Sequence, residues 1–247
     1  MDIQAYEELL LWNPSPPRSI IAPEILIEET KLVLFGAPKT FKSLLAQQLG
    51  ICFVTGTPWL GYDVEPSKVL YVQGEISKIP FKGRVLKMGS QYKIPPQQLL
   101  FSSQFNMKLD RDSDMKELEG EIAKRKPNIL MIDPAYKFLV TQTEDSISRF
   151  LGFLDYLIDA HHMCIILIHH SRKPRTNPTG QLIDMGGSEL RGPLYEQWAD
   201  SIIRVTGDIT SDYRVLDFEL RHAQFLMNPI TIKLDRGSLW FHKISVT

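Results

Sequence analysis

The turn at residues 36–43 ends in a lysine and a serine, Lys42 and Ser43, whose side chains suit the binding of phosphate. An apolar run at 31–35 precedes this turn and a helical pattern at 42–54 follows it. In a strand, turn and helix of this kind, backbone N–H groups surround the β-phosphate, the lysine reaches the β and γ oxygens, and the hydroxyl holds Mg2+. The residues expected to bind the nucleotide are Gly36, Ala37, Pro38, Lys39, Thr40, Phe41, Lys42, Ser43 and Leu44.

The loop departs from the usual pattern GxxxxGK[ST] at Phe41, which stands where the second glycine is expected. Glycine is favoured at that position because the backbone passes close to the phosphate in a strained conformation. The alternative interpretation is an ordinary turn between a strand and a helix that carries lysines by chance. The strand, turn and helix around the motif favour the phosphate loop.

Two acidic residues follow apolar runs at the expected carboxyl ends of strands, where parallel sheets collect their ligands. Asp133 ends the run NILMID and is expected to hold the water shell of magnesium. Glu75 ends KVLYVQGE, a strand that we expect beside the phosphate-loop strand, and its carboxylate would polarise the water that attacks the γ-phosphate. Either acid alone is more often a solvated loop end. Their placement together with Lys42 and Ser43 favours the catalytic interpretation.

Two adjacent histidines, His169 and His170, follow the apolar run MCIILI and are expected at the same edge of the sheet. A neutral imidazole there would hydrogen-bond to the γ-phosphate or to Glu75 and report hydrolysis to the loop beyond. A zinc site is the weaker alternative, because neighbouring residues of a strand point to opposite faces and neither CxxC nor HExxH accompanies them.

The elements that position these residues alternate between short apolar runs and longer amphipathic stretches, which is typical of crossover units on a mostly parallel sheet. Strands are expected at 31–35, 68–73, 99–103, 128–132 and 163–168, and helices at 42–54, 78–88, 113–125, 146–161 and 190–199. The runs NILMID and MCIILI lack polar alternation and should be central strands. Beyond Ala199 the alternation of apolar and polar residues predicts a half-exposed antiparallel extension.

These patterns predict an α/β fold, with residues 18–247 as one domain and residues 1–17 as an arm that ends in a proline cluster. The chain has 28 Lys and Arg against 29 Asp and Glu, so contact with nucleic acid or an anionic membrane needs a local patch. Cys52 and Cys164 lie in apolar runs and suit buried thiols in a reducing cytoplasm. The N-terminus lacks the basic residues and apolar length of a signal peptide or membrane span. We therefore expect a cytoplasmic protein.

Five segments carry a resemblance to a known family: GAPKTFKSLLA, GTPWLGYDVEPSKVLYVQGE, LMIDP, HHSRK and GGSELRGPLYEQWADSIIRV. In this order they resemble the RecA-like ATPases of the RepA type, which are hexameric plasmid replicative helicases similar in core to DnaB and RadA. The resemblance covers roughly residues 20–245. It implies a RecA-like P-loop fold, ATP and Mg2+ as ligands, and Glu75 as the catalytic base.

The resemblance also implies a ring in which ATP lies between neighbouring subunits and basic residues of one subunit complete the next subunit's site. Arg191 and Arg221 are the matching candidates. An arginine supplied in trans stabilises the charge that develops on the transferred phosphoryl group. The alternative for both residues is surface pairing with Glu189 or Glu219.

The segment SRKPRTNPTGQLIDMGGS at 171–188 is long, polar and rich in proline and glycine. A stretch of this kind between a core strand and a helix is usually mobile or functional. In RecA-like rings the loop at this place lines the channel that holds single-stranded DNA. Arg172, Lys173 and Arg175 would then contact phosphates without sequence preference. A disordered surface loop is the alternative.

The leading hypothesis is a homo-hexameric ATPase that moves along single-stranded DNA as a replicative helicase or a helicase-like motor. The second is an ATP-gated DNA-binding or recombination accessory protein without unwinding activity. Replication or recombination proteins would be its partners in either case. A small-molecule kinase is a third hypothesis, against which the extra antiparallel strands and the lack of a lid-like arginine cluster argue.

Overall fold

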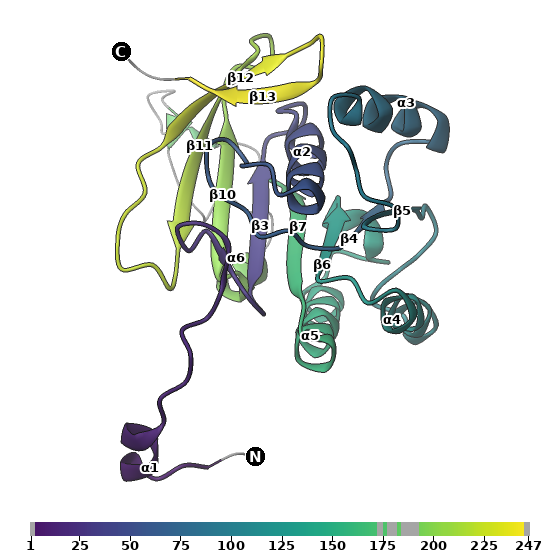
Figure 1. Cartoon of the computed structure of the whole chain (residues 1–247). Coiled ribbons are helices and arrows are strands. Elements are labelled where there is room, and N and C mark those ends of the chain that lie inside the picture. The colour runs from purple at the N-terminus through teal and green to yellow at the C-terminus, as the bar shows by residue number, and fades with distance from the viewer. Residues whose placement is uncertain (1–2, 172–174, 177–181, 184–192, 245–247) are drawn as a thin grey trace.

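A twisted central sheet organises the chain (Figure 1). The computed structural model describes residues 3–171, 175–176, 182–183 and 193–244, and within these ranges nine strands form this sheet. In spatial order they are β13 (Trp240–Lys243), β12 (Ile230–Asp235), β11 (Tyr213–Leu220), β10 (Ser201–Thr206), β3 (Lys31–Gly36), β7 (Cys164–His170), β6 (Ile129–Asp133), β4 (Val69–Gln73) and β5 (Leu99–Ser103). Two short antiparallel pairs lie outside it, β1 (Ser19–Ile21) with β2 (Leu26–Ile27) and β8 (Arg175–Thr176) with β9 (Leu182–Ile183).

The five strands expected from apolar runs form the parallel part of the sheet, in the order β3, β7, β6, β4 and β5. Side chains along β6 and β7 are buried almost throughout, which confirms that both are central strands. Successive side chains of a strand point to opposite faces, so Leu32 and Leu34 enter one hydrophobic core while Val33 and Phe35 enter the other. The sheet is therefore covered on both faces, as the lack of alternation predicts.

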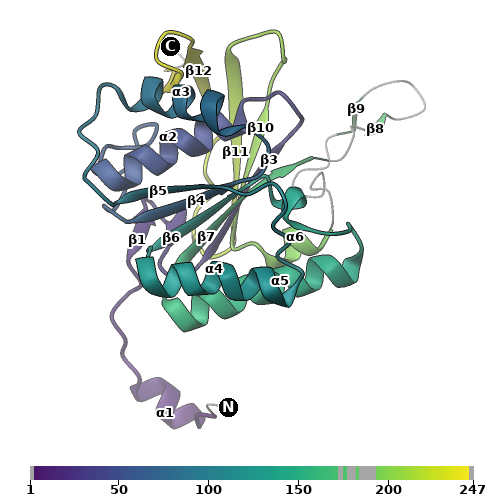
Figure 2. The same cartoon turned by 90° about the vertical axis from the view of Figure 1, so that its right-hand side faces the viewer.

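Helices form a layer on each face of the sheet (Figure 2). One layer contains α2 (Lys42–Thr55) and α3 (Lys78–Gly89), and the other contains α4 (Asp112–Arg125), α5 (Glu144–His161) and α6 (Pro193–Trp198). α2 is apolar around most of its circumference and is almost wholly buried. α5 is amphipathic, and the hydroxyl of Thr143 caps its N-terminus by accepting the N–H of Ser146 at 3.4 Å. The expected helices are thus present at their expected places.

The C-terminal strands extend the sheet beyond β3. The pairs β10–β11, β11–β12 and β12–β13 are antiparallel, as expected. On its other side β10 pairs with β3, and this pairing is parallel, because the chain crosses over from β7 through α6 and returns in the same direction. β10 approaches β3 so closely that a Cβ on Gly36 would lie 2.3 Å from the carbonyl oxygen of Val205. Only glycine fits at the end of β3.

The N-terminal arm contains one short helix, α1 (Tyr6–Leu11), which the sequence pattern did not predict. None of its residues is buried, and Figure 1 shows it apart from the sheet and its helices. Regular pairing begins at Ser19 of β1, directly after the proline cluster. A 3-10 helix at Ala135–Phe138 completes the described elements. Among the helices described, none is long and apolar enough to cross a membrane.

Candidate nucleotide site

The predicted phosphate loop connects β3, which ends at Gly36, to α2, which begins at Lys42. The Lys42 side chain is only 5% exposed, and its ammonium donates to the carbonyl oxygen of Ala37 at 2.7 Å and to Oγ1 of Thr40 at 3.3 Å. Burial lowers the Lys42 pKa to about 8, against the opposing effect of the Asp133 and Glu75 carboxylates. Among the described residues no carboxylate lies within ion-pair distance of this ammonium. The loop thus encloses a desolvated positive charge.

The backbone of the loop adopts the conformation for which glycine is normally used. Phe41 has φ 65° and ψ 22°, and Lys39 has φ 66°, so both lie in the left-handed region. Phe41 is also the residue before the first turn of α2, and its carbonyl oxygen accepts the N–H groups of Leu44 and Leu45. Phe41 therefore adopts the left-handed backbone conformation for which the usual motif has glycine, although it has a large side chain.

Ser43 and Asp133 lie together at the carboxyl end of the sheet. The Ser43 hydroxyl donates to Oδ1 of Asp133 at 3.1 Å, and the Tyr71 hydroxyl donates to Oδ2 at 2.6 Å. Burial raises the Asp133 pKa, while the two hydroxyl donors act against this rise. Tyr71 was not among the predicted site residues. A hydroxyl inside the apolar run VLYVQ of β4 was the available signal, because a buried hydroxyl needs a partner.

Glu75 follows β4 and is exposed. The side chain of Gln73 shapes this strand end, because its Oε1 accepts the N–H groups of Glu75 at 3.1 Å and Ile76 at 2.9 Å. The hydroxyl of Tyr136 lies 3.4 Å from Oε1 of Glu75. The expectation that this strand lies beside β3 is wrong, because β7 and β6 stand between β3 and β4. The Glu75 carboxylate nevertheless raises the Lys42 pKa, so it acts on the same site.

His169 and His170 end β7, which is the strand beside β3. Their side chains diverge, as expected for neighbours on a strand. His169 is fully buried, and its ring packs against that of Tyr195 in α6 with 4.3 Å between ring centroids. His170 is half-buried beside Tyr136, with 5.1 Å between ring centroids. Because Tyr136 also contacts Glu75, His170 is the histidine that the fold brings toward the expected base.

These residues fit a magnesium-bound nucleotide. The buried Lys42 ammonium and the N–H groups at the start of α2 suit an anionic phosphate, which would offset the desolvation of the lysine. The Ser43 hydroxyl and the Asp133 carboxylate supply the oxygen ligands that Mg2+ prefers. The fit rests on charge, burial and donor type at one edge of the sheet.

Comparison with known proteins shows the family of this chain. A family model described as an AAA domain matches residues 3–176. The chain belongs to the AAA domain family. No curated protein sequence matches it.

Two solved structures are similar to most of this chain. The crystal structure of the RadB recombinase is similar with a TM-score of 0.60 and 14% identity, over 88% of this chain and 92% of that one. A KaiC-like protein from the hyperthermophilic archaeon Pyrococcus horikoshii is similar with a TM-score of 0.65 and 14% identity, over 92% of this chain and 94% of that one. These structures share the RecA-like P-loop fold, which confirms the predicted fold class.

The structure describes only some of the basic residues predicted to act on nucleotide or DNA. Arg221 follows β11 at the edge of the sheet where β3 begins, since Leu220 pairs with Ser201 and Ser201 pairs with Leu32. It donates to the carbonyl oxygen of Gln197 at 2.8 Å and lies 3.8 Å from the carboxylate of Asp200. The expected residues Arg172, Lys173 and Arg191 lie outside the described residues, and of Arg175 only the backbone in β8 is described.

Tyr71→Phe is expected to raise the Mg2+ concentration needed for half-maximal nucleotide binding about tenfold, because a buried oxygen of Asp133, the carboxylate expected to bind magnesium, loses its donor. The phenylalanine keeps the ring contacts of Tyr71 with Phe81 and Phe101. Magnesium titrations of fluorescent ATP-analogue binding measure the change. Tyr156→Phe is the matched control, because its hydroxyl contacts Glu119 on the surface of α5 and α4. Equal magnesium dependence in the two variants would contradict a role of Tyr71 in orienting Asp133.

Proposed function

We propose that this chain binds and hydrolyses Mg-ATP and uses the hydrolysis to act on single-stranded DNA. The observation that carries the first part is the buried Lys42 ammonium, enclosed by the loop ahead of α2 and joined at one edge of the sheet by Ser43 and Asp133. Magnesium held through Ser43 and Asp133 would neutralise phosphate charge as a Lewis acid.

Each side chain of the site has a distinct role in this proposal. Lys42 and the loop amides hold the triphosphate and stabilise charge on its oxygens. Glu75 is exposed and held by contacts with Gln73 and Tyr136, so its carboxylate can accept the proton of an attacking water. His170 lies beside Tyr136 and would sense the state of Glu75 through that ring. Tyr71 fixes Asp133 without itself contacting the nucleotide.

The second part of the proposal is that the chain forms a ring of subunits. The position of Arg221 supports it. Within one chain, Lys42 follows the carboxyl end of β3, whereas Arg221 lies at the edge where β3 begins. Arg221 therefore cannot reach the nucleotide of its own subunit, and a role in catalysis requires a neighbouring subunit. The Arg221 side chain is 49% exposed, so a neighbour can still reach the guanidinium although it contacts Gln197 and Asp200. We propose a homo-hexamer in which Arg221 and Arg191 complete the adjacent site, with Arg172, Lys173 and Arg175 contacting DNA phosphates.

Phosphate release measured with and without single-stranded DNA, combined with strand displacement of a forked duplex, tests this function. A helicase-like motor gives DNA-stimulated hydrolysis and displacement that both depend on Glu75. Stimulated hydrolysis without displacement would favour the ATP-gated accessory protein instead. Native mass measurement with an ATP analogue and an oligonucleotide reports the subunit number. A strictly monomeric protein with full ATPase activity would exclude the ring and the action of Arg221 in trans.

A further inference from the structure

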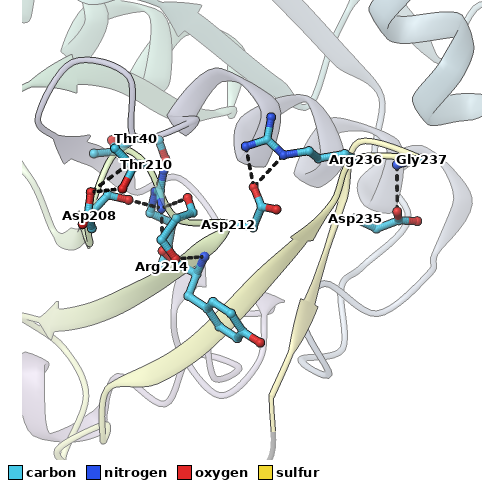
Figure 3. A network of polar contacts seen from close by, with 10 residues as sticks. Thr40, Asp208, Thr210, Asp212, Arg214, Asp235, Arg236 and Gly237 are labelled. Atoms are coloured by element: carbon cyan, nitrogen blue, oxygen red, sulfur yellow. Dashed lines mark hydrogen bonds and ion pairs between the residues drawn. The ribbon is translucent and has the colours of Figure 1, made fainter.

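Arg214, a buried arginine in the C-terminal strands, contacts the phosphate loop. It lies near the start of β11 and is 1% exposed, although it carries a charge. Its Nε donates to the carbonyl oxygen of Thr40 at 3.2 Å, within the loop (Figure 3). Thr40 is separated from Arg214 by 174 residues of sequence, so this bond ties two distant segments together.

The remaining contacts of Arg214 fix the turn between β10 and β11. Its Nη1 donates to the carbonyl oxygens of Asp208 at 2.9 Å and Ser211 at 2.8 Å, and also to that of Tyr213. The turn is braced in its own right, because Oδ1 of Asp208 accepts both the N–H and the hydroxyl of Thr210 at 2.8 Å. Arg214 therefore connects the phosphate loop to a rigid support.

The guanidinium also lies over the aromatic ring of Phe41, with 4.8 Å from its Cζ to the ring centroid. A buried cation above an aromatic face is a favourable contact that is stronger when both groups are desolvated. The second terminal nitrogen of Arg214, Nη2, has no hydrogen-bond partner among the described residues. The contact with the ring therefore adds to the hydrogen bonds that stabilise this buried arginine.

Phe41 is a loop residue whose backbone conformation needs such support. It adopts the left-handed conformation, which is unfavourable for a residue with a Cβ and which glycine adopts freely. Arg214 holds this conformation from two sides, by the bond to the carbonyl of the preceding residue, Thr40, and by the contact with the Phe41 ring.

We infer that Arg214 is a positioning residue for the phosphate loop, and that the pair of Arg214 and Phe41 performs the task that the second glycine performs in the usual motif. The pair presets the loop in its phosphate-binding conformation before the nucleotide arrives. The inference deepens the proposed function and rests on it for its binding readout. It also makes the C-terminal antiparallel strands part of the nucleotide site.

Rescue by glycine separates this role from simple packing. Calorimetry with Mg-ATP is carried out on wild type, Arg214→Met, Phe41→Gly and the double variant. We expect Arg214→Met to weaken binding about tenfold when Phe41 is present. Phe41→Gly serves as the second background, in which the backbone needs no support. In the double variant the loss caused by Arg214→Met should shrink to less than about threefold. An equal loss with and without Phe41 would overturn the inference.

Two further variants keep the test decisive. Phe41→Leu removes the ring but keeps the disfavoured backbone conformation, so it should weaken ATP binding about tenfold, as is expected of Arg214→Met. This variant tests the pair even if Arg214→Met folds poorly. Wild-type affinity in Phe41→Leu would count against the pair. Arg236→Met is the control, because Arg236 is an exposed arginine of the same strands that forms an ion pair with Asp212 at 2.7 Å, and it should bind like wild type (Figure 3).

Hydrogen exchange without nucleotide distinguishes failure of this inference from failure of the proposed function. If wild type binds no ATP, the function is excluded while the loop can still be probed. Arg214→Met should then increase the exchange of the peptide that covers residues 37–44 relative to Arg236→Met. Unchanged exchange in that peptide would overturn the positioning role, whatever the affinity for ATP.

Discussion

Glu75→Gln should abolish steady-state ATP hydrolysis while leaving ATP binding nearly unchanged. Glutamine keeps the shape of the side chain but cannot accept a proton from water, and loss of a general base typically slows a reaction by about a hundredfold to ten-thousandfold. The carboxylate is exposed at the end of β4 and shares no hydrogen bond with Asp133 among the contacts described, so its loss leaves the metal ligands in place. Single-turnover phosphate release and calorimetry measure the two effects separately.

The control for this variant is Glu119→Gln, which removes an exposed carboxylate of α4 that contacts only the hydroxyl of Tyr156 among the interactions described. It should hydrolyse ATP at the wild-type rate. Full turnover in Glu75→Gln would place the general base elsewhere, whereas joint loss of binding and turnover would mean that Glu75 holds the nucleotide. Either result would remove the catalytic role assigned to this residue.

The strands and helices of the parallel half were predictable because each has a strong local signal. A fully buried strand such as β6 appears as an uninterrupted apolar run, and α5 shows helical periodicity over its whole length. The order of strands has no such local signal. Glu75 was assigned to a strand beside β3, but pairing across the sheet places two strands between them. The parallel pairing of β10 with β3 has no local signal either, since the alternation of apolar and polar residues is the same in a parallel and an antiparallel strand.

The site was predicted where chemistry and sequence motif coincide, and was missed where residues distant in sequence support it. Lys42, Ser43 and Asp133 come together as expected. Tyr71 and Arg214 lie in strands that were interpreted only as scaffold. The sequence did contain a signal for Arg214, because this residue shares a strand face with buried Leu216. A charged side chain on an apolar face must have polar partners to be buried.

Lys42→Ala should weaken Mg-ATP binding by about a hundredfold or more, because the variant loses a desolvated charge that no other described side chain replaces. Among the described hydrogen bonds the ammonium donates to the Ala37 carbonyl and the Thr40 hydroxyl, so the fold should persist without it. Calorimetry measures the affinity, and the thermal unfolding midpoint serves as the check on folding. Binding equal to wild type would show that the loop does not use this lysine for phosphate.

The lowered Lys42 pKa makes ATP affinity depend on pH with a defined sign. In the free protein the ammonium loses its proton near pH 8, because burial disfavours the charge. A bound triphosphate favours the charged form and raises this pKa, so binding is strongest below pH 8 and falls as the pH rises above it, by up to about tenfold per pH unit. Lys42→Arg keeps its charge throughout and should show a flat profile over this interval. Parallel profiles for the two proteins between about pH 7 and 9.5 would mean that Lys42 does not carry the charge that the phosphate meets.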